Sequence, residues 1–281
     1  PAGETTDEGR KSMLRTVLTS LGYSDSDINT MPEMRNEYSD DFTKIVAFDL
    51  EWEKGTNNII GISIVELLNG ESTPVNSKVI YSATGKDKNF TKEDAEEFLQ
   101  LMHRYQNEGF KVTGHNILGA DSDVQKLVSV SGNTKLGMSV ALRSLDTMLL
   151  AFRNGDKTSF SRNFGPSLEN LSQAFKVGSK AGAGITGESA HGVWKSGNYA
   201  KFEEYIQGDS VLAARILQEM AKNKGKSVKV MNSRKQEQTL QIHETVPIWY
   251  DTGKPEIGRN QRYTGMNVLY DIQSFNNLRE N

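Results

Sequence analysis

The spacing of apolar residues along the chain predicts a domain in which strands and helices are mixed. Residues 44–50, 58–68 and 77–82 form apolar runs between polar segments, which is the pattern of buried strands. The run at 58–68 is rich in β-branched residues and is therefore expected near the centre of a sheet. A fourth short strand is predicted at 111–116, where it ends in a polar turn.

Apolar residues at helical spacing predict the other elements. Thr91 begins one helix with a capping pattern, and Ser167 opens another that ends near Phe175. The remaining predicted helices cover 10–21, 121–130, 142–153 and 198–223. Strands and helices in this arrangement indicate an α/β fold.

The polarity of the chain divides it into three parts. Residues 1–43 are expected to form an N-terminal helix followed by a polar linker over 24–43, and residues 44–224 to form the main domain. Residues 225–281 mix short β-like runs with turns, which indicates a C-terminal extension or small subdomain. The glycine-rich stretch 178–190 is predicted to be a loop.

The composition excludes several classes of protein. The 281 residues include no cysteine, which excludes disulfides, thiolate metal sites and cysteine nucleophiles. The 33 Lys and Arg against 36 Asp and Glu give a net charge of −3, which neither indicates nor excludes a nucleic-acid partner. No apolar stretch approaches the roughly 18 residues of a membrane helix, and the N-terminus does not resemble a signal peptide. We therefore expect a soluble intracellular protein with no membrane partner, in the cytoplasm (that of the host if the protein is viral).

Two carboxylates follow the first apolar run directly. Because side chains of a strand alternate, Asp49 and Glu51 project to the same side. Two such charges at the end of a buried strand repel each other unless a divalent cation lies between them. The pair therefore indicates half of a metal site.

Three further residues complete a possible two-metal site. Asp121 follows the predicted strand and turn at 111–120 and opens a helix, while Tyr205 and Asp209 stand four residues apart on the predicted helix 198–223. Residues at that spacing share a helical face. A two-metal phosphodiester hydrolase uses such carboxylates to hold cations about 3.5–4 Å apart, and one cation activates the attacking water.

Each of these motifs is weak when taken alone. Most Asp-x-Glu pairs are solvated loop ends, a helical Tyr-x-x-x-Asp is usually a core tyrosine beside a surface carboxylate, and a lone Asp121 is more often a helix N-cap. Their joint order in an α/β pattern is what favours a metal site.

In three segments the chain resembles the tyrosine subclass of the DEDD 3′–5′ exonuclease superfamily, which includes the proofreading domains of DNA polymerases. The similarity spans about 44–222, and the matching motifs are Phe48-Asp49-Leu50-Glu51, the segment 114–121 and Tyr205-Ile206-Gln207-Gly208-Asp209. The resemblance implies a mixed five-stranded sheet of ribonuclease-H type, flanked by helices. It also implies a catalytic set in which Asp49, Glu51, Asp121 and Asp209 bind two Mg²⁺ or Mn²⁺ ions and Tyr205 positions the water.

The second motif departs from the family pattern. Ala120 stands where an aromatic residue is common, and Asp123 is an alternative ligand with a leucine four residues on. The spacing from Asn116 favours Asp121, with Asp123 as the reserve.

Three more residues are expected near the terminal nucleotide. Leu50 is expected to act as a wedge beside the last bases, with Asn116 close by. For His115, a contact with the substrate phosphate and a hydrogen bond at the strand end remain equally open.

Two groups of residues near the C-terminus have open roles. A late basic cluster is either a track for a nucleic-acid backbone or a solvated helix end; it comprises Lys222, Lys224, Lys226, Lys229, Arg234 and Lys235. A set of aromatic residues is more often a small core than a stacking surface; it comprises Trp249, Tyr250, Tyr263 and Tyr270.

The resemblance leads us to expect a metal-dependent 3′–5′ exonuclease that releases nucleoside monophosphates from single-stranded or mismatched DNA 3′ ends. It would act alone or within a replication or repair assembly, with a polymerase or another replication protein as a potential partner. One alternative is a 3′–5′ exoribonuclease on the same fold, since no feature of the sequence recognises a 2′-hydroxyl. The other is a non-catalytic nucleic-acid-binding or scaffold protein, against which the intact catalytic set argues.

Overall fold

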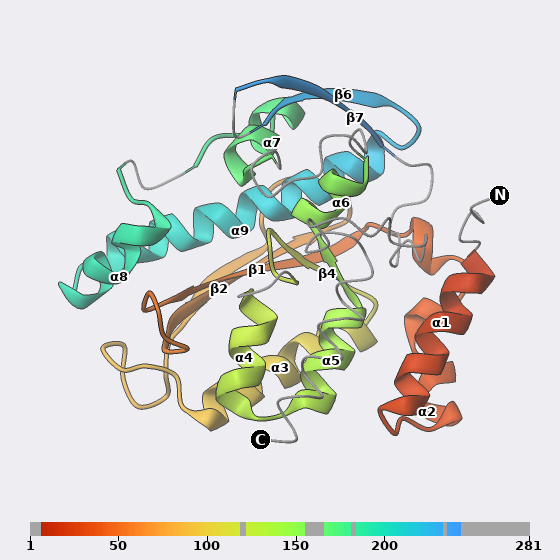
Figure 1. Cartoon of the computed structure of the whole chain (residues 1–281), viewed down its shortest axis with the longest axis horizontal. Coiled ribbons are helices and arrows are strands. Elements are labelled where there is room, and N and C mark those ends of the chain that lie inside the picture. The colour runs from red at the N-terminus through yellow and green to blue at the C-terminus, as the bar shows by residue number, and fades with distance from the viewer. Residues whose placement is uncertain (1–6, 119–121, 155–165, 181–183, 233–234, 243–281) are drawn as a thin grey trace.

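The computed structural model describes residues 7–118, 122–154, 166–180, 184–232 and 235–242. At its centre lies a mixed five-stranded sheet with the strand order β3-β2-β1-β4-β5 (Figure 1). The strands are β1 (Lys44–Trp52), β2 (Ile59–Leu68), β3 (Asn76–Ile80), β4 (Lys111–Gly114) and β5 (Ser144–Asp146). The pairs β1–β2 and β2–β3 are antiparallel, whereas β1–β4 and β4–β5 are parallel. The predicted ribonuclease-H-like α/β fold is confirmed.

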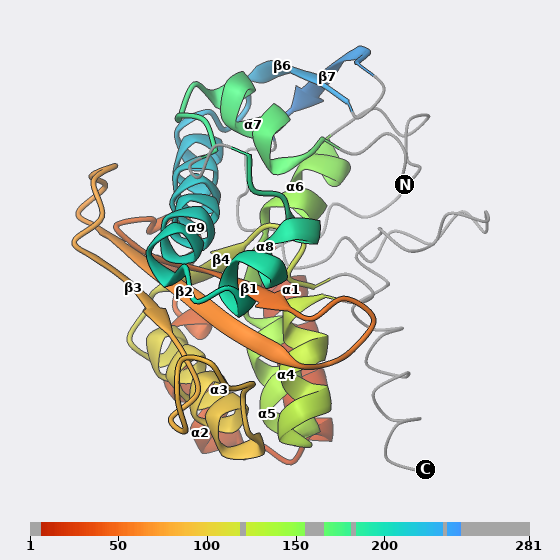
Figure 2. The ribbon, with the colours of Figure 1, turned by 90° about the vertical axis from the view of Figure 1, so that its left-hand side faces the viewer.

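Helices cover both faces of the sheet. They are α1 (Asp7–Ser20), α2 (Asp25–Thr30), α3 (Lys92–Asn107), α4 (Asp123–Ser131), α5 (Thr134–Leu142), α6 (Thr147–Asn154), α7 (Leu168–Phe175), α8 (Gly187–Lys195) and α9 (Tyr199–Lys222). Figure 2 shows α9 along one face and α3, α4 and α5 against the other. None of the helices in these described ranges combines the length and the apolar character needed to span a bilayer.

The central strand β1 supplies residues to the cores on both faces. Val46, Phe48 and Leu50 belong to the apolar cluster that includes α3 and α4, whereas Ile45 and Ala47 belong to the cluster that includes α9. Because the side chains alternate, the residues that follow Ala47 on the second face are Asp49 and Glu51. The strand therefore directs both carboxylates toward α9.

The predicted helix 142–153 is wrong in its first part. Helix α5 ends at Leu142, the short strand β5 follows, and α6 begins only at Thr147. Strand β5 pairs with β4, and its residues are buried. The apolar run fitted a helix, but hydrogen bonding at the edge of the sheet takes precedence over that local preference.

The segment 24–43 is folded rather than an extended linker. Ser24 caps α2 with a capping box, and two 3-10 turns follow at Pro32–Met34 and Tyr38–Asp40. Ile28, Met31 and Tyr38 contribute to the same apolar cluster as β1 and α3. Scattered apolar residues among many polar ones gave no periodic pattern that would predict this packing.

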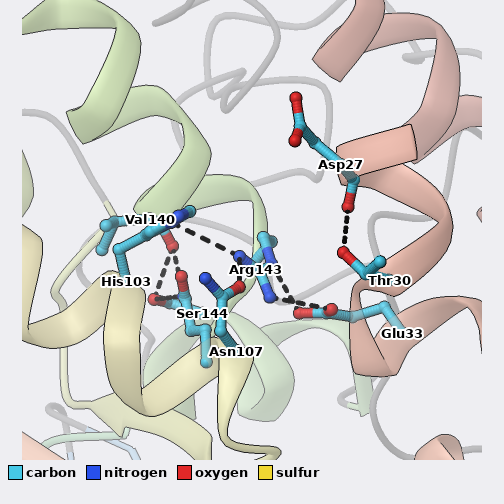
Figure 3. Close-up of polar contacts among 9 residues, drawn as sticks. Asp27, Thr30, Glu33, His103, Asn107, Val140, Arg143 and Ser144 are labelled. Atoms are coloured by element: carbon cyan, nitrogen blue, oxygen red, sulfur yellow. Dashed lines mark hydrogen bonds and ion pairs between the residues drawn. The ribbon is translucent and has the colours of Figure 1, made fainter. Parts of the chain in front are cut away.

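A buried ion pair fastens this N-terminal segment to the domain. Arg143 donates to Glu33 through Nε at 2.7 Å and through Nη2 at 3.0 Å, and both side chains are almost fully buried. Figure 3 shows Asn107 and His103 beside the same guanidinium. Burial and the charge of Arg143 lower the pKa of His103, so that its Nδ1 acts as an acceptor.

The structure also describes parts of the predicted loop 178–190 and of the C-terminal extension 225–281. Helix α8 begins at Gly187, so the last four residues of the predicted loop 178–190 are helical instead. A hairpin of β6 (Ser227–Met231) and β7 (Glu237–Gln241) buries Val230 and Leu240 in the cluster that includes α7 and α9.

Within the late basic cluster, Lys222, Lys224 and Lys229 form ion pairs with acidic side chains. Arg234 and the aromatic set beginning at Trp249 lie outside the described residues.

Replacing Glu33 by Gln should destabilise the protein by about 3–5 kcal/mol, because the charge of Arg143 would be left buried and unpaired. The free energy of unfolding in urea measures this loss. The control is Asp25→Asn, which breaks the exposed Arg15–Asp25 pair at 3.1 Å and should cost less than about 1 kcal/mol. Equal losses in the two variants would contradict the proposed importance of the buried pair.

Candidate active site

Four carboxyl groups from three elements come together beside the end of β1. Asp49 and Glu51 belong to β1, Asp123 is the first residue of α4, and Asp209 lies on α9. Each member interacts electrostatically with at least one of the others. Glu51, Asp123 and Asp209 are each less than 10 % exposed.

Burial and mutual repulsion favour the protonated form of these groups. The pKa of Asp49 is raised well above its usual range, first by burial and then by the charges of Asp209, Asp123 and Glu51. Burial and the charge of Asp209 raise the pKa of Glu51 to about 8. Burial and Glu51 likewise raise the pKa of Asp123, and burial raises that of Asp209.

Three carboxylate oxygens of this set are buried without a hydrogen-bond partner among the described residues. They are Oδ2 of Asp49, Oδ2 of Asp123 and Oδ1 of Asp209. Buried polar atoms are rarely left in this condition, and each exception indicates a missing ligand, water or ion. Carboxylate oxygens are the preferred ligands of Mg²⁺, and they also suit Mn²⁺.

Helix α4 is joined to β1 through its first residue. The pairing between β1 and β4 ends at Ala47 and Thr113, and the backbone N–H of Leu50 lies near enough to the Asp123 carboxylate to act on its pKa. Asp123 therefore lies beside the segment that carries Asp49 and Glu51. Asp121, the residue favoured by sequence spacing, lies outside the described residues, so Asp123 is the second-motif carboxylate that the structure describes at the site.

Small residues of β2 bring α9 close to the sheet. Ser63 lies opposite Asp49, donates its hydroxyl proton to the carbonyl of Ile206 at 2.9 Å and accepts a hydrogen bond from the Ser210 hydroxyl. Gly61 lies opposite Glu51, and a Cβ at that position would come within 2.8 Å of the Phe202 ring. Helix α9 can therefore lie directly over the two carboxylates of β1.

Tyr205 belongs to the same group. Its side chain is buried, and its hydroxyl lies near enough to the carboxylates of Glu51 and Asp209 to change their pKa values. Burial and the neighbouring carboxylates, Glu51 first and then Asp209, raise the pKa of Tyr205 far above its usual range. The hydroxyl therefore keeps its proton and acts as a hydrogen-bond donor.

Lys180 brings a positive charge into the site, and no sequence motif predicted it there. Its Nζ lies 2.7 Å from Oδ2 of Asp209 and 5.6 Å from the centre of the Tyr205 ring. The backbone N–H of Lys180 donates to Glu169 on α7 at 3.2 Å, which fixes the start of the glycine-rich segment. The ammonium group partly offsets the negative charge, so it stands where a cation is favoured.

The three expected substrate contacts have different environments. Leu50 is 2 % exposed and packs in the apolar cluster on the face opposite Asp49. Its role as a wedge beside the last bases stays a prediction, and it would require the side chain to leave this packing. Asn116 is partly buried and adopts a left-handed backbone with φ of 64°. His115 makes the strand-end hydrogen bond, with Nδ1 3.0 Å from the Thr147 hydroxyl. Burial and then Lys180 lower the pKa of His115 to about 3, so it is neutral at physiological pH.

The positions of these side chains differ from those of a finished metal centre. Within the ranges that the structure describes, no group of three or more histidine, aspartate or glutamate side chains is arranged to hold a metal ion. Comparisons of the chain with protein-family models, curated proteins and solved structures find no match. We therefore infer the function of the chain from the chemistry of the site and from the sequence motifs.

The metal-free protein should become less stable as the pH rises from about 5 to about 8. Glu51 has a pKa of about 8 in the folded protein and near 4.5 ordinarily, so the folded state binds a proton that the unfolded state releases in this range. Melting temperatures in EDTA across this pH range measure the effect. Glu51→Gln removes the titrating group and should flatten the decline, whereas an unchanged slope in that variant would contradict the assignment.

Proposed function

We propose that the protein is a metal-dependent 3′–5′ exonuclease that releases nucleoside monophosphates from single-stranded or mismatched DNA ends. The observation that carries this proposal is a set of three buried carboxylate oxygens, beside Glu51 and the Tyr205 hydroxyl, that have no hydrogen-bond partner in the part of the chain that the structure describes. A site for a structural ion would not need a tyrosine hydroxyl among its acids. The order of the motifs along the chain supports the same reaction.

The donor atoms fit divalent cations in charge and in chemical type. Asp49, Glu51, Asp123 and Asp209 would hold the cations, and Asp49 is the member on whose pKa all three others act. When bound, such cations activate water as a nucleophile and stabilise the charge on the leaving oxygen.

The chain's own residues would orient the reactants. The Tyr205 hydroxyl stays protonated and can donate a hydrogen bond to the attacking water while Glu51 accepts one from it. Lys180 would have to leave Asp209 when a cation binds there, because both positive charges use the same carboxylate. The released ammonium group would remain near the site, since the backbone of Lys180 is held by Glu169.

The proposal also covers the substrate polymer, which is DNA, and a protein partner, which is a polymerase. DNA is favoured over RNA by the resemblance to proofreading domains alone, and association with a polymerase rests on that resemblance as well. An oligonucleotide digest therefore has to include both polymers.

A 5′-labelled single-stranded DNA should be shortened to a descending ladder in the presence of Mn²⁺ or Mg²⁺ and remain intact in EDTA. Asp49→Asn keeps the shape of the side chain but removes its charge, so kcat/KM should fall about a thousandfold or more. This factor corresponds to a loss of several kcal/mol in transition-state stabilisation. Asp25→Asn changes an exposed residue that belongs to none of the motifs, and this variant should retain full activity. Matched duplex ends should be cut more slowly than single strands, because opening a base pair costs a few kcal/mol.

Several outcomes of this digest would redirect the proposal. Faster shortening of RNA than of DNA would favour the exoribonuclease. Cleavage of circular single-stranded DNA would indicate an endonuclease, and binding without cleavage would indicate the non-catalytic alternative.

Tyr205→Phe should lower kcat by about a hundredfold with little change in affinity for single-stranded DNA, because only a hydrogen bond to the reacting water is lost. The matched control is Tyr199→Phe in the same helix, whose ring packs against Tyr81. Single-turnover rates and binding by fluorescence anisotropy separate the two effects. An unchanged rate in Tyr205→Phe would assign this tyrosine to the core.

A further inference from the structure

We propose that Asp146 is a positioning residue that sets the geometry of the second-motif carboxylate, Asp123, through the backbone of the turn between β4 and α4. The inference rests on the proposed function of the site. Asp146 terminates β5, is 2 % exposed, and belongs to none of the three motifs.

Among the described residues, three backbone N–H groups from two segments donate to the carboxylate of Asp146. Oδ1 accepts from Asn116 at 2.9 Å and from Met148 at 2.9 Å, and Oδ2 accepts from Leu118 at 2.9 Å. A bond to Met148 alone would be an ordinary helix cap for α6. The two bonds to Asn116 and Leu118 are long-range, and they hold the turn that leaves β4.

This turn is connected to the first residues of α4. The carbonyl of Ile117, which lies between the two anchored amides, accepts from the backbone N–H of Val124 at 3.2 Å. Val124 follows Asp123 directly, and the N–H of Leu50 lies near enough to the Asp123 carboxylate to act on its pKa. Asp146 is thereby linked to the metal-binding group through a short series of hydrogen bonds.

The turn needs such an anchor because its backbone is constrained. Asn116 has a left-handed conformation, which is unfavourable for a residue with a side chain. A Cβ on Gly114 would lie 2.6 Å from the carbonyl oxygen of Phe48, so the chain passes very close to β1 as it turns. Thr147 adds support by donating to the carbonyl of Gly114 at 3.1 Å.

Asp146 differs from the candidate ligands in how its oxygens are used. Both of its oxygens already accept backbone N–H groups, whereas Asp49, Asp123 and Asp209 each have a buried oxygen without a hydrogen-bond partner in the described ranges. It is therefore assigned an indirect role, by fixing where Asp123 lies relative to Asp49 and Glu51.

The test compares Asp146→Asn with Asp94→Asn in the full chain. Asp94 is a matched control, because it also accepts three hydrogen bonds at a helix start, from the backbone of Thr91 and Ala83 and the hydroxyl of Ser82, but at α3. In Asp146→Asn the new amide group faces a backbone donor, so the turn must shift. A displacement of about 1 Å costs about a hundredfold in rate, and we expect a loss of this size in kcat per folded molecule.

Two further measurements separate positioning from stability. The rise in melting temperature produced by Mn²⁺ should need about tenfold more metal in Asp146→Asn than in wild type, and excess Mn²⁺ should restore part of the activity. Asp94→Asn should match the wild type in kcat and in Mn²⁺ dependence even if its melting temperature falls. Asp146→Ser, which introduces no amide, should show the same pattern as Asp146→Asn.

The possible failures are distinguishable. If wild type neither degrades nucleic acid nor gains stability from Mn²⁺, the proposed function is overturned and the positioning role with it. If wild type is active but Asp146→Asn matches Asp94→Asn in kcat and Mn²⁺ dependence, only the positioning role is overturned. Failure of both Asp146 variants to fold, with Asp94→Asn folded, would make Asp146 a residue for stability alone and also overturn it.

Discussion

Repulsion among buried carboxyl groups is the constraint that the arrangement around β1 has to satisfy. Asp49, Glu51, Asp123 and Asp209 lie close enough that each charge raises the pKa of a neighbour. In the metal-free protein, protons and the ammonium group of Lys180 offset this repulsion. Only a rigid scaffold keeps such groups together, because a flexible one would relax by turning them toward solvent.

Two other buried charged side chains, Arg143 and Lys111, have partners within the protein. Arg143 is matched by Glu33 and Asn107. Lys111, almost fully buried, donates to the carbonyl of Tyr38 and lies over its ring; burial lowers its pKa to about 7. Each of these charged groups has partners that compensate for its removal from water. Among the described residues, the carboxylates near β1 leave three buried oxygens without a partner, as do the uncharged side chains of Gln106 and Ser139. Three such oxygens on neighbouring acidic groups are the feature that a binding function explains and a purely structural role does not.

The sequence predicted those parts of the site that depend on local geometry. Asp49 and Glu51 follow from alternation along a strand, and Tyr205 with Asp209 from the helical repeat. The choice between Asp121 and Asp123 could not be made in this way, since both positions lie near the start of the predicted helix, and it stays open because Asp121 lies outside the described residues. Lys180 and Ser63 were missed because their partners are 29 and 147 residues away, at Asp209 and Ser210. Strand β5 was missed because a buried run of three residues carries no periodicity.

Contacts between elements that are distant in sequence bring the four acids together. Pairing between β1 and β4 ends at Ala47, two residues before Asp49, and beyond that point the N–H of Leu50 lies near the Asp123 carboxylate and acts on its pKa. On the other side of β1, Gly61 and Ser63 of β2 allow α9 to approach. Had β4 continued to pair with β1, it would have occupied the edge of β1 beside Leu50, where the first residue of α4 lies. The candidate site thus depends on where the sheet stops as much as on the acids themselves.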